Sequence, residues 1–345
     1  MCGRYTVYGL SASYFTRKVV GLFTYKAIPF DFRLKTLALR PMIEEKSGTH
    51  LIPVVVTPEG EWLFDSTPIA LEMDRRFADS TVVPPAPLGM MTTRILEDFF
   101  DEWVTRFAIF FRWQSPENIE TAGRSLALES AGPAAGDEDR EAGAALAGKL
   151  LGAIQIWAAN AAEALGAGAD AKAELETEWR TLCALMSDHF KSHPFLGGVR
   201  PTLADFALYG GLSAHFLLEP ETRQRTLAGG PGLEAYRPRM EAARADSMPA
   251  WEKGAELPPT LGRLLRYVAA GFHPFLEANR RALATGNAHF SLDTAYGARR
   301  FAARAYSEKT RAETAAALAA LSAAQQASLA TTLGPLGVLE VYDLT

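Results

Sequence analysis

The chain has 345 residues and is 48% hydrophobic, which is enough for two packed domains and an appendage. Its net charge of -5 and the lack of a basic segment argue against nucleic acid as a partner. No apolar run reaches the length of a membrane span and no signal-peptide pattern opens the chain, so we expect a cytoplasmic protein without a membrane partner. Two cysteines, Cys2 and Cys183, exclude a disulfide framework, and the six histidines show no zinc-ligand spacing.

The first 80 residues alternate between strand-like and helix-like segments. Residues 4–8 have strand composition, and Ser11 or Ser13 can cap the helix that follows them. A second strand is predicted over 27–32 and a second helix over 37–46. Two short strands joined by a turn, over 51–56 and 62–64, are followed by one more helix. Asp65 and Ser66 can cap this helix, and Ile69, Met73 and Phe77 recur in it at helical spacing. This order, βαβαββα, is typical of a thioredoxin-like domain.

Pro53 is unusual because it lies inside a strand-like run, where it removes a hydrogen-bond donor from the sheet. A proline at this point belongs at a sheet edge, and we predict that its bond to Ile52 is cis. An ordinary edge strand is the alternative interpretation. Asp65 and Ser66 follow at a predicted helix start, where their side chains can act as caps.

The segments YGLSASYFTRKV and Ile-Pro-Val, followed by Asp-Ser at a helix start, resemble in this order the glutathione-binding half of glutathione transferases. The resemblance implies that the backbone of Ile52, beside Pro53, holds the cysteinyl part of glutathione. It implies that Asp65 and Ser66 hold the γ-glutamyl end. Glutathione is therefore the expected co-substrate, and no metal is expected.

The glycyl end of glutathione is the least determined part of this expected site. Some classes of the family carry a lysine just before the proline, where this chain has Leu51. His50 is the first candidate to bind the glycyl carboxylate, with Lys35 and Arg40 as alternatives.

The family activates the glutathione thiol with a hydroxyl at the start of the first helix, where the helix dipole favours an anion. Ser13 stands five residues after Tyr8 and just before the predicted helix, so it is the first candidate, and Ser11 is a close rival. Tyr8 is a tyrosine-type alternative, together with Tyr5, although Tyr8 also suits a packed strand position. A plain N-cap role for Ser13 is compatible with these assignments.

Residues 79–88 are rich in proline and predict a linker, after which the composition becomes helical. Helices are predicted over 91–113, 144–165 and 172–190, with a mobile surface loop over 115–142. The first helix carries an aromatic stripe that suits core packing, and the resemblance implies that some of its rings also wall a hydrophobic substrate pocket. The candidate rings are Phe99, Trp103 and Phe107.

Thr202 and Asp205 form a capping box ahead of an apolar helix, and we interpret them as folding determinants. The resemblance ends near residue 255. Beyond it, helices are predicted over about 261–283 and 298–321, with a polar break over 286–293. The fold class is therefore α+β, a thioredoxin-like domain followed by an all-α domain with a helical extension. The predicted segments are 1–80, 90–255 and 256–345.

The resemblance implies a glutathione transferase, in which the glutathione thiolate attacks a hydrophobic electrophile, and the family habit implies a homodimer. A non-catalytic glutathione-binding or interaction protein on the same fold is the alternative from another class. A glutathione-dependent dehalogenase, ether-cleaving enzyme or isomerase is a third interpretation.

Overall fold

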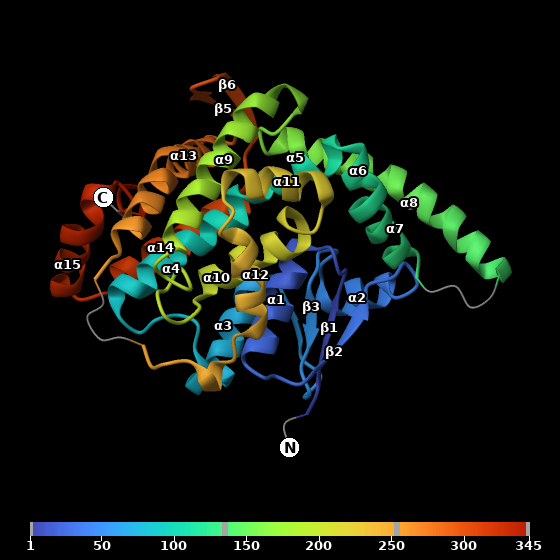
Figure 1. The fold of residues 1–345 in the computed structure, drawn as a ribbon, viewed down its shortest axis with the longest axis horizontal. Coiled ribbons are helices and arrows are strands. Elements are labelled where there is room, and N and C mark those ends of the chain that lie inside the picture. The colour runs from blue at the N-terminus through green and yellow to red at the C-terminus, as the bar shows by residue number, and fades with distance from the viewer. Residues whose placement is uncertain (1–2, 133–136, 252–255, 343–345) are drawn as a thin grey trace.

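The computed structural model describes residues 3–132, 137–251 and 256–342, and Figure 1 shows a small sheet packed against a larger body of helices. The sheet has the strand order β2-β1-β3-β4. Strand β1 pairs in parallel with β2 and antiparallel with β3, and β3 pairs antiparallel with β4. The bounds are β1 Tyr5–Gly9, β2 Phe30–Leu34, β3 Val54–Val56 and β4 Trp62–Phe64. With three helices interleaved, the predicted thioredoxin-like order is confirmed.

Successive side chains of a strand point to opposite faces of the sheet, and here both faces carry apolar residues. Helices therefore pack on both faces. Val7 and Val55 belong to the main core, together with residues of the first and third helices, whereas Tyr8 and Val54 pack with Ile43 of the second. The three helices are α1 Tyr14–Tyr25, α2 Arg40–Ser47 and α3 Ser66–Arg76. The N-termini of α1 and α3 therefore belong to helices on one face of the sheet.

The helical body begins with one long helical segment, as the sequence predicts over 91–113. It runs from α4 (Pro87–Asp98) through a π-helical turn, η2 (Phe99–Trp103), into α5 (Thr105–Gln114). The π-turn is an addition that the periodicity did not predict. Further helices of the body are α9 Lys172–His189, α10 Leu203–Gly211, α11 Pro220–Gly229 and α12 Leu233–Ala242, with a π-turn, η5, at Leu212–Phe216.

The loop predicted over 115–142 is wrong for the described part of that segment. It forms α6 (Pro116–Asn118), a π-turn (η3, Ile119–Gly123), α7 (Arg124–Ala131) and the start of α8 (Asp137–Ala164). Ser115 caps α6, since its hydroxyl oxygen accepts a hydrogen bond from the Asn118 amide at 3.3 Å. Residues 133–136 of the predicted loop lie outside the described residues.

Helix α8 extends away from the body, at the right of Figure 1. By length and composition, its stretch Arg140–Ala164 is apolar enough to cross a membrane, and an 18-residue window of it has a mean hydropathy of 1.3. This finding differs from the sequence prediction that no run reaches that length. It is weak support for a membrane span, because one such helix also occurs in soluble proteins.

The last part of the chain contains a β-hairpin as well as helices. Its elements are α13 Pro259–Ala284, β5 His289–Thr294, β6 Gly297–Ala302, α14 Ala305–Ala319 and α15 Ala323–Leu333. The helix predicted from residue 298 is therefore wrong at its start, because Phe290 and Phe301 pair across the hairpin and pack on Phe275 of α13. Helix α13 contacts α9, and α14 contacts α4, so this extension lies against the helical body.

The capping box of α10 is present as predicted. The backbone amide of Thr202 donates to Oδ2 of Asp205 at 2.8 Å. The same carboxylate accepts from the Leu196 amide at 2.7 Å and from the Tyr236 hydroxyl at 2.9 Å. Asp205 is fully buried, so these bonds give it a structural role at the start of α10.

Candidate functional site

Ser13 is the N-cap residue of α1, with an extended backbone conformation. Its hydroxyl oxygen accepts a hydrogen bond from the Thr16 amide at 3.4 Å, which is long for such a bond. The hydroxyl proton has no acceptor among the residues that the structure describes. This half-buried side chain is therefore able to donate a hydrogen bond at the N-terminus of a helix.

Ser11, the rival of Ser13, is engaged through its backbone. Its amide donates to Oε2 of Glu129 on α7 at 2.7 Å, and its carbonyl accepts from Nε of Arg17 at 2.6 Å. The carbonyl of Ser130, next to Glu129, accepts from the Leu37 amide at 2.8 Å. The end of α7 is thus docked on the β1–α1 and β2–α2 loops, an arrangement that the sequence reasoning missed.

Tyr8 occupies a core position. Its ring is 8% exposed and stacks on Trp62, with ring centroids 6.0 Å apart, in the cluster that contains Ile43 of α2. Tyr5 is buried too and packs against Phe23 in the main core. Tyr8 therefore lies on the α2 face of the sheet, opposite the face that α1 covers, and of the predicted hydroxyls only Ser13 and Ser11 lie near the α1 start.

The bond between Ile52 and Pro53 is cis, as predicted. Strand β3 begins only at Val54, which pairs with Tyr8 of β1. The backbone N–H and C=O of Ile52 consequently have no hydrogen-bond partner in the described part of the chain. A peptide-like ligand finds a donor and an acceptor at this edge.

Lys35 brings a positive charge to the loop that precedes Pro53. Its Nζ donates to the carbonyl of His50 at 2.8 Å and to Oε1 of Glu44 at 3.2 Å. Burial lowers the pKa of Lys35, and Glu44 opposes this effect. The side chain of His50 is exposed, and Arg40 is held by Glu44 at 2.8 Å, so Lys35 is the cation that contacts the loop directly.

The start of α3 has free hydrogen-bonding groups. Asp65, at the N-cap position, adopts a positive φ of 71° and makes no side-chain capping bond. Ser66 is 4% exposed, yet its hydroxyl has no partner among the described residues. The first-turn amides of Ser66 and Thr67 have no acceptor within the helix, so this end favours an anion.

The side chain of Asp65 is in contact with the C-terminal extension. Its Oδ2 accepts a hydrogen bond from the hydroxyl of Tyr306 on α14 at 2.6 Å. The Nζ of Lys309, one turn further along α14, lies 4.0 Å from the same oxygen. No sequence motif indicated that the extension reaches this residue.

A buried polar cluster fixes the starts of α1 and α3 relative to the helical body. The Nζ of Lys18 on α1 donates to Glu97, Asp101 and the hydroxyl of Thr67 on α3. The Thr67 hydroxyl in turn donates to Glu97. Burial raises the pKa of Asp101 to about 8, while the Lys18 ammonium lowers it. These contacts tie α1, α3 and the α4–η2 segment together around the candidate site.

A second buried network holds the loop before Ser13. Arg112 on α5 donates through one terminal nitrogen to the carbonyl of Ala12 at 3.0 Å and through Nε to Glu219 at 2.5 Å. The Nδ1 of His215 lies 3.3 Å from the same carboxylate oxygen. Burial lowers the pKa of His215 to about 4, and Arg112 adds to this effect.

The three rings predicted to wall a substrate pocket are core residues. Phe99 and Phe107 are fully buried, and Trp103 is 5% exposed. Trp103 packs against Phe272 and Phe275 of α13, and against Phe301 of β6. The predicted pocket is therefore corrected, because the extension fills the space beside Phe99 and Trp103, and Phe107 packs on Trp179.

Cys183, the cysteine in the described part of the chain, is not a candidate nucleophile. Cys183 on α9 is free and fully buried, and burial raises the pKa of its thiol well above the usual value, which fits an inert side chain. Cys2 lies outside the described residues. Within the described ranges, no group of three or more His, Cys, Asp or Glu side chains is arranged to hold a metal ion.

Comparison with known proteins gives one family match. Residues 7–81 match the model of the glutathione S-transferase N-terminal domain. No curated protein sequence matches the chain.

Solved structures of similar shape share little sequence with the chain. A glutathione S-transferase from Methylobacterium radiotolerans, in complex with glutathione sulfonate, is 20% identical, with 73% of this chain and 98% of that chain covered and a TM-score of 0.43. The β-etherase LigF from Sphingobium sp. is 13% identical, with coverages of 75% and 98% and a TM-score of 0.43. FzlA from C. crescentus is 14% identical, with coverages of 76% and 92% and a TM-score of 0.46.

With TM-scores below 0.5, these likenesses add nothing to the family-model match. That match covers the thioredoxin-like part of the fold, from β1 to the residues just after α3. The family similarity therefore rests on residues 7–81, which match the glutathione S-transferase N-terminal domain and make up less than half of the chain.

Proposed function

We propose that this protein binds glutathione between the Ile52 edge and the start of α3, and that the glutathione thiolate attacks a hydrophobic electrophile. The observation that carries the proposal is the family match over residues 7–81. It falls on a fold in which the backbone of Ile52 and the hydroxyl of Ser66 lack partners among the described residues. A ligand that carries a peptide group and a carboxylate can form hydrogen bonds with the Ile52 backbone and the Ser66 hydroxyl.

Each part of glutathione has a proposed partner. The ammonium of the γ-glutamyl end binds Asp65, and its α-carboxylate binds the Ser66 hydroxyl and the first-turn amides of α3. The cysteinyl peptide group pairs with the backbone of Ile52. The glycyl carboxylate meets the charge of Lys35 beside His50.

The proposed activation of the thiol depends on Ser13. Its hydroxyl donates a hydrogen bond to the sulfur, and the N-terminus of α1 favours the negative charge. Both effects stabilise the thiolate relative to the thiol, so they lower the thiol pKa and raise the concentration of the nucleophile at neutral pH. The thiolate then forms a bond to the electrophile as the leaving group departs with the electron pair.

Titration calorimetry with glutathione tests the binding step. Asp65→Asn should weaken glutathione binding by about tenfold or more, since a charge-assisted hydrogen bond contributes about 1.5–3 kcal/mol. Asp246→Asn, at an exposed position near α12, is the matched control and should bind as the unmodified protein does. No heat at millimolar glutathione from the folded protein would contradict the proposal.

One observation favours the non-catalytic alternative. The carboxylate of Glu129 accepts the Ser11 amide proton at 2.7 Å, two residues from Ser13. A negative charge bound to the loop that carries Ser13 opposes a thiolate at the start of α1 and raises its pKa. A glutathione-binding protein that shows no turnover with several aryl halides would support this second function. The homodimer stays a prediction, which light scattering of the purified protein checks.

A further inference from the structure

We infer that the C-terminal extension completes the γ-glutamyl subsite, with Lys309 as a binding residue for the ligand's α-carboxylate and Tyr306 as a positioning residue for Asp65. The inference deepens the proposed glutathione binding and rests on it. It starts from the two contacts between α14 and Asp65, made by the Tyr306 hydroxyl at 2.6 Å and by the Lys309 ammonium at 4.0 Å.

Helix α14 is a fixed part of the structure. Asn279 of α13 accepts from the Arg304 amide at 2.7 Å and donates to the Arg304 carbonyl at 2.9 Å. The guanidinium of Arg304 pairs with Glu102 at 2.9 Å, and the buried hydroxyl of Ser307 donates to the same carboxylate. Held at its start in this way, α14 presents Tyr306 and Lys309 to Asp65 without a conformational change.

The periodicity of α14 separates a buried face from an accessible one. Ser307, Arg311 and Ala315 are buried against the body, whereas the Lys309 side chain is 50% exposed. Tyr306 has an exposed fraction of 36% and lies three residues before Lys309, so both share the accessible face. A small ligand in solvent can therefore reach both side chains.

The ammonium of Lys309 has N–H donors that are available to a ligand. It lies 4.0 Å from Asp65 and 3.9 Å from Glu313, and both distances exceed that of a hydrogen bond. It is therefore held between two carboxylates without a close bond to either. A ligand carboxylate that arrives between Lys309 and the start of α3 gains a direct charge-assisted hydrogen bond.

The charges match an α-amino acid group, which carries an ammonium and a carboxylate on one carbon. Asp65 offers a carboxylate whose Oδ1 has no hydrogen-bond partner among the described residues, because Tyr306 binds Oδ2. Lys309 offers the complementary cation next to it. Tyr306 fixes the orientation of Asp65, so the free oxygen is directed to the ligand ammonium instead of to Lys309.

Calorimetry with three ligands tests each contact. Glutathione carries both charged groups, 4-aminobutyryl-Cys-Gly keeps the ammonium and lacks the α-carboxylate, and glutaryl-Cys-Gly keeps the carboxylate and lacks the ammonium. Lys309→Met should weaken glutathione and the glutaryl analogue about five- to tenfold, and leave the aminobutyryl analogue unchanged. Tyr306→Phe should weaken glutathione and the aminobutyryl analogue, and leave the glutaryl analogue unchanged. Lys309→Arg should restore most of the lost affinity.

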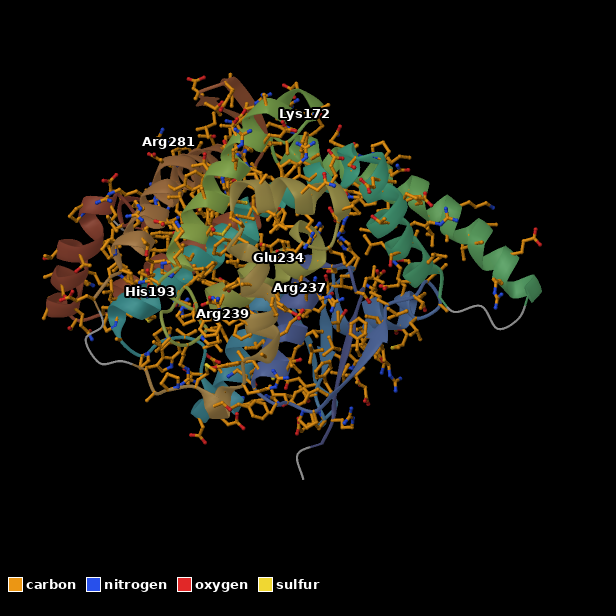
Figure 2. All side chains as sticks on the ribbon, viewed as in Figure 1. Lys172, His193, Glu234, Arg237, Arg239 and Arg281 are labelled. Carbon is orange, nitrogen blue, oxygen red and sulfur yellow. The ribbon has the colours of Figure 1, made fainter. Side chains whose placement is uncertain are left out.

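Lys172→Met is the matched control. Lys172 lies at the start of α9, at the top of Figure 2, and like Lys309 it stands 3.9 Å from a glutamate four residues later. This control should bind all three ligands normally. Equal affinity of Lys309→Met and the unmodified chain for glutathione overturns the inference, as does an equal loss for all three ligands. If the unmodified chain binds no glutathione, the proposed function fails and the inference fails with it.

Discussion

Replacing Ser13 by alanine should slow the proposed reaction without unfolding the site. The lost N-cap bond is long, at 3.4 Å, so its removal should cost about 0.5–1 kcal/mol of stability. Helix α1 keeps its packing, because Val19, Leu22 and Phe23 are fully buried. Thermal unfolding of the variant should therefore stay close to that of the unmodified protein.

The effect on the thiol should be much larger. A hydrogen bond to a charged group contributes about 1.5–3 kcal/mol, and 1.36 kcal/mol corresponds to one pKa unit. Ser13→Ala should therefore raise the pKa of bound glutathione by about one to two units. At a pH below that pKa, the thiolate fraction falls about ten- to a hundredfold, and kcat/KM falls with it. Glutathione affinity should change little, because Asp65, Ser66 and Ile52 hold the rest of the ligand.

The assay is the pH dependence of kcat/KM with a model aryl halide. The profile of Ser13→Ala should shift to higher pH, and its activity should approach that of the unmodified protein once the thiol ionises. Ser11→Ala and Tyr8→Phe are the comparisons, and both should keep the original profile. An unchanged profile for Ser13→Ala, or a shift in one of the other two variants, would refute the assignment.

Three further predictions concern buried or charged groups outside the proposed glutathione contacts. If the protein is an enzyme, Glu129→Gln should raise turnover severalfold near pH 6.5 by removing a negative charge near the thiolate, and lower turnover would contradict this. Glu219→Gln should destabilise the fold by about 3 kcal/mol in urea unfolding, because it leaves the buried Arg112 without its counter-charge, and a change below 1 kcal/mol would contradict this. Burial lowers the pKa of His273 to about 4, so its neutral form contributes stability above pH 6.5 that is lost as the pH falls toward 4. As the pH falls through that range, the free energy of unfolding of His273→Phe should rise relative to that of the unmodified protein by about 1.4 kcal/mol per pH unit. A difference in urea midpoints that stays constant with pH would contradict this.

The thioredoxin-like part was predictable because its signals are local. The turn at 58–60 joins two short apolar runs, and Asp65 with Ser66 marks a helix start, so the order of elements followed from neighbouring residues. The capping box at Thr202 and Asp205 was predictable for the same reason.

Two errors came from composition outweighing local signals that were present. Phe290 and Leu292 alternate with polar residues ahead of Gly297, which is a hairpin pattern, but the alanine-rich surroundings favoured a helix. Ser115 and Pro116 form a helix start, but the small and acidic residues that follow favoured a loop. In both segments, the apolar positions decide the structure because they have a core to pack against.

The long-range contacts of the site could not be predicted from local sequence patterns. Asp65 and Tyr306 are 241 residues apart, and Ser11 and Glu129 are 118 residues apart. Such contacts depend on how helices pack, and the residues near each partner in the sequence carry no pattern for them. The predicted substrate wall failed for this reason, since Trp103 is covered by residues of the extension.

The packing of the C-terminal extension on Trp103 has a consequence for folding during synthesis. A chain leaves the ribosome from its N-terminus, so Phe99 and Trp103 emerge long before Phe272, Phe275 and Phe301, which pack on them or complete their cluster. Until then the nascent protein carries an uncovered aromatic surface and a Glu102 carboxylate without Arg304. The helical body can therefore close only after Phe301 and Arg304 have emerged, and a chaperone that shields aromatic surfaces has its greatest value in that interval.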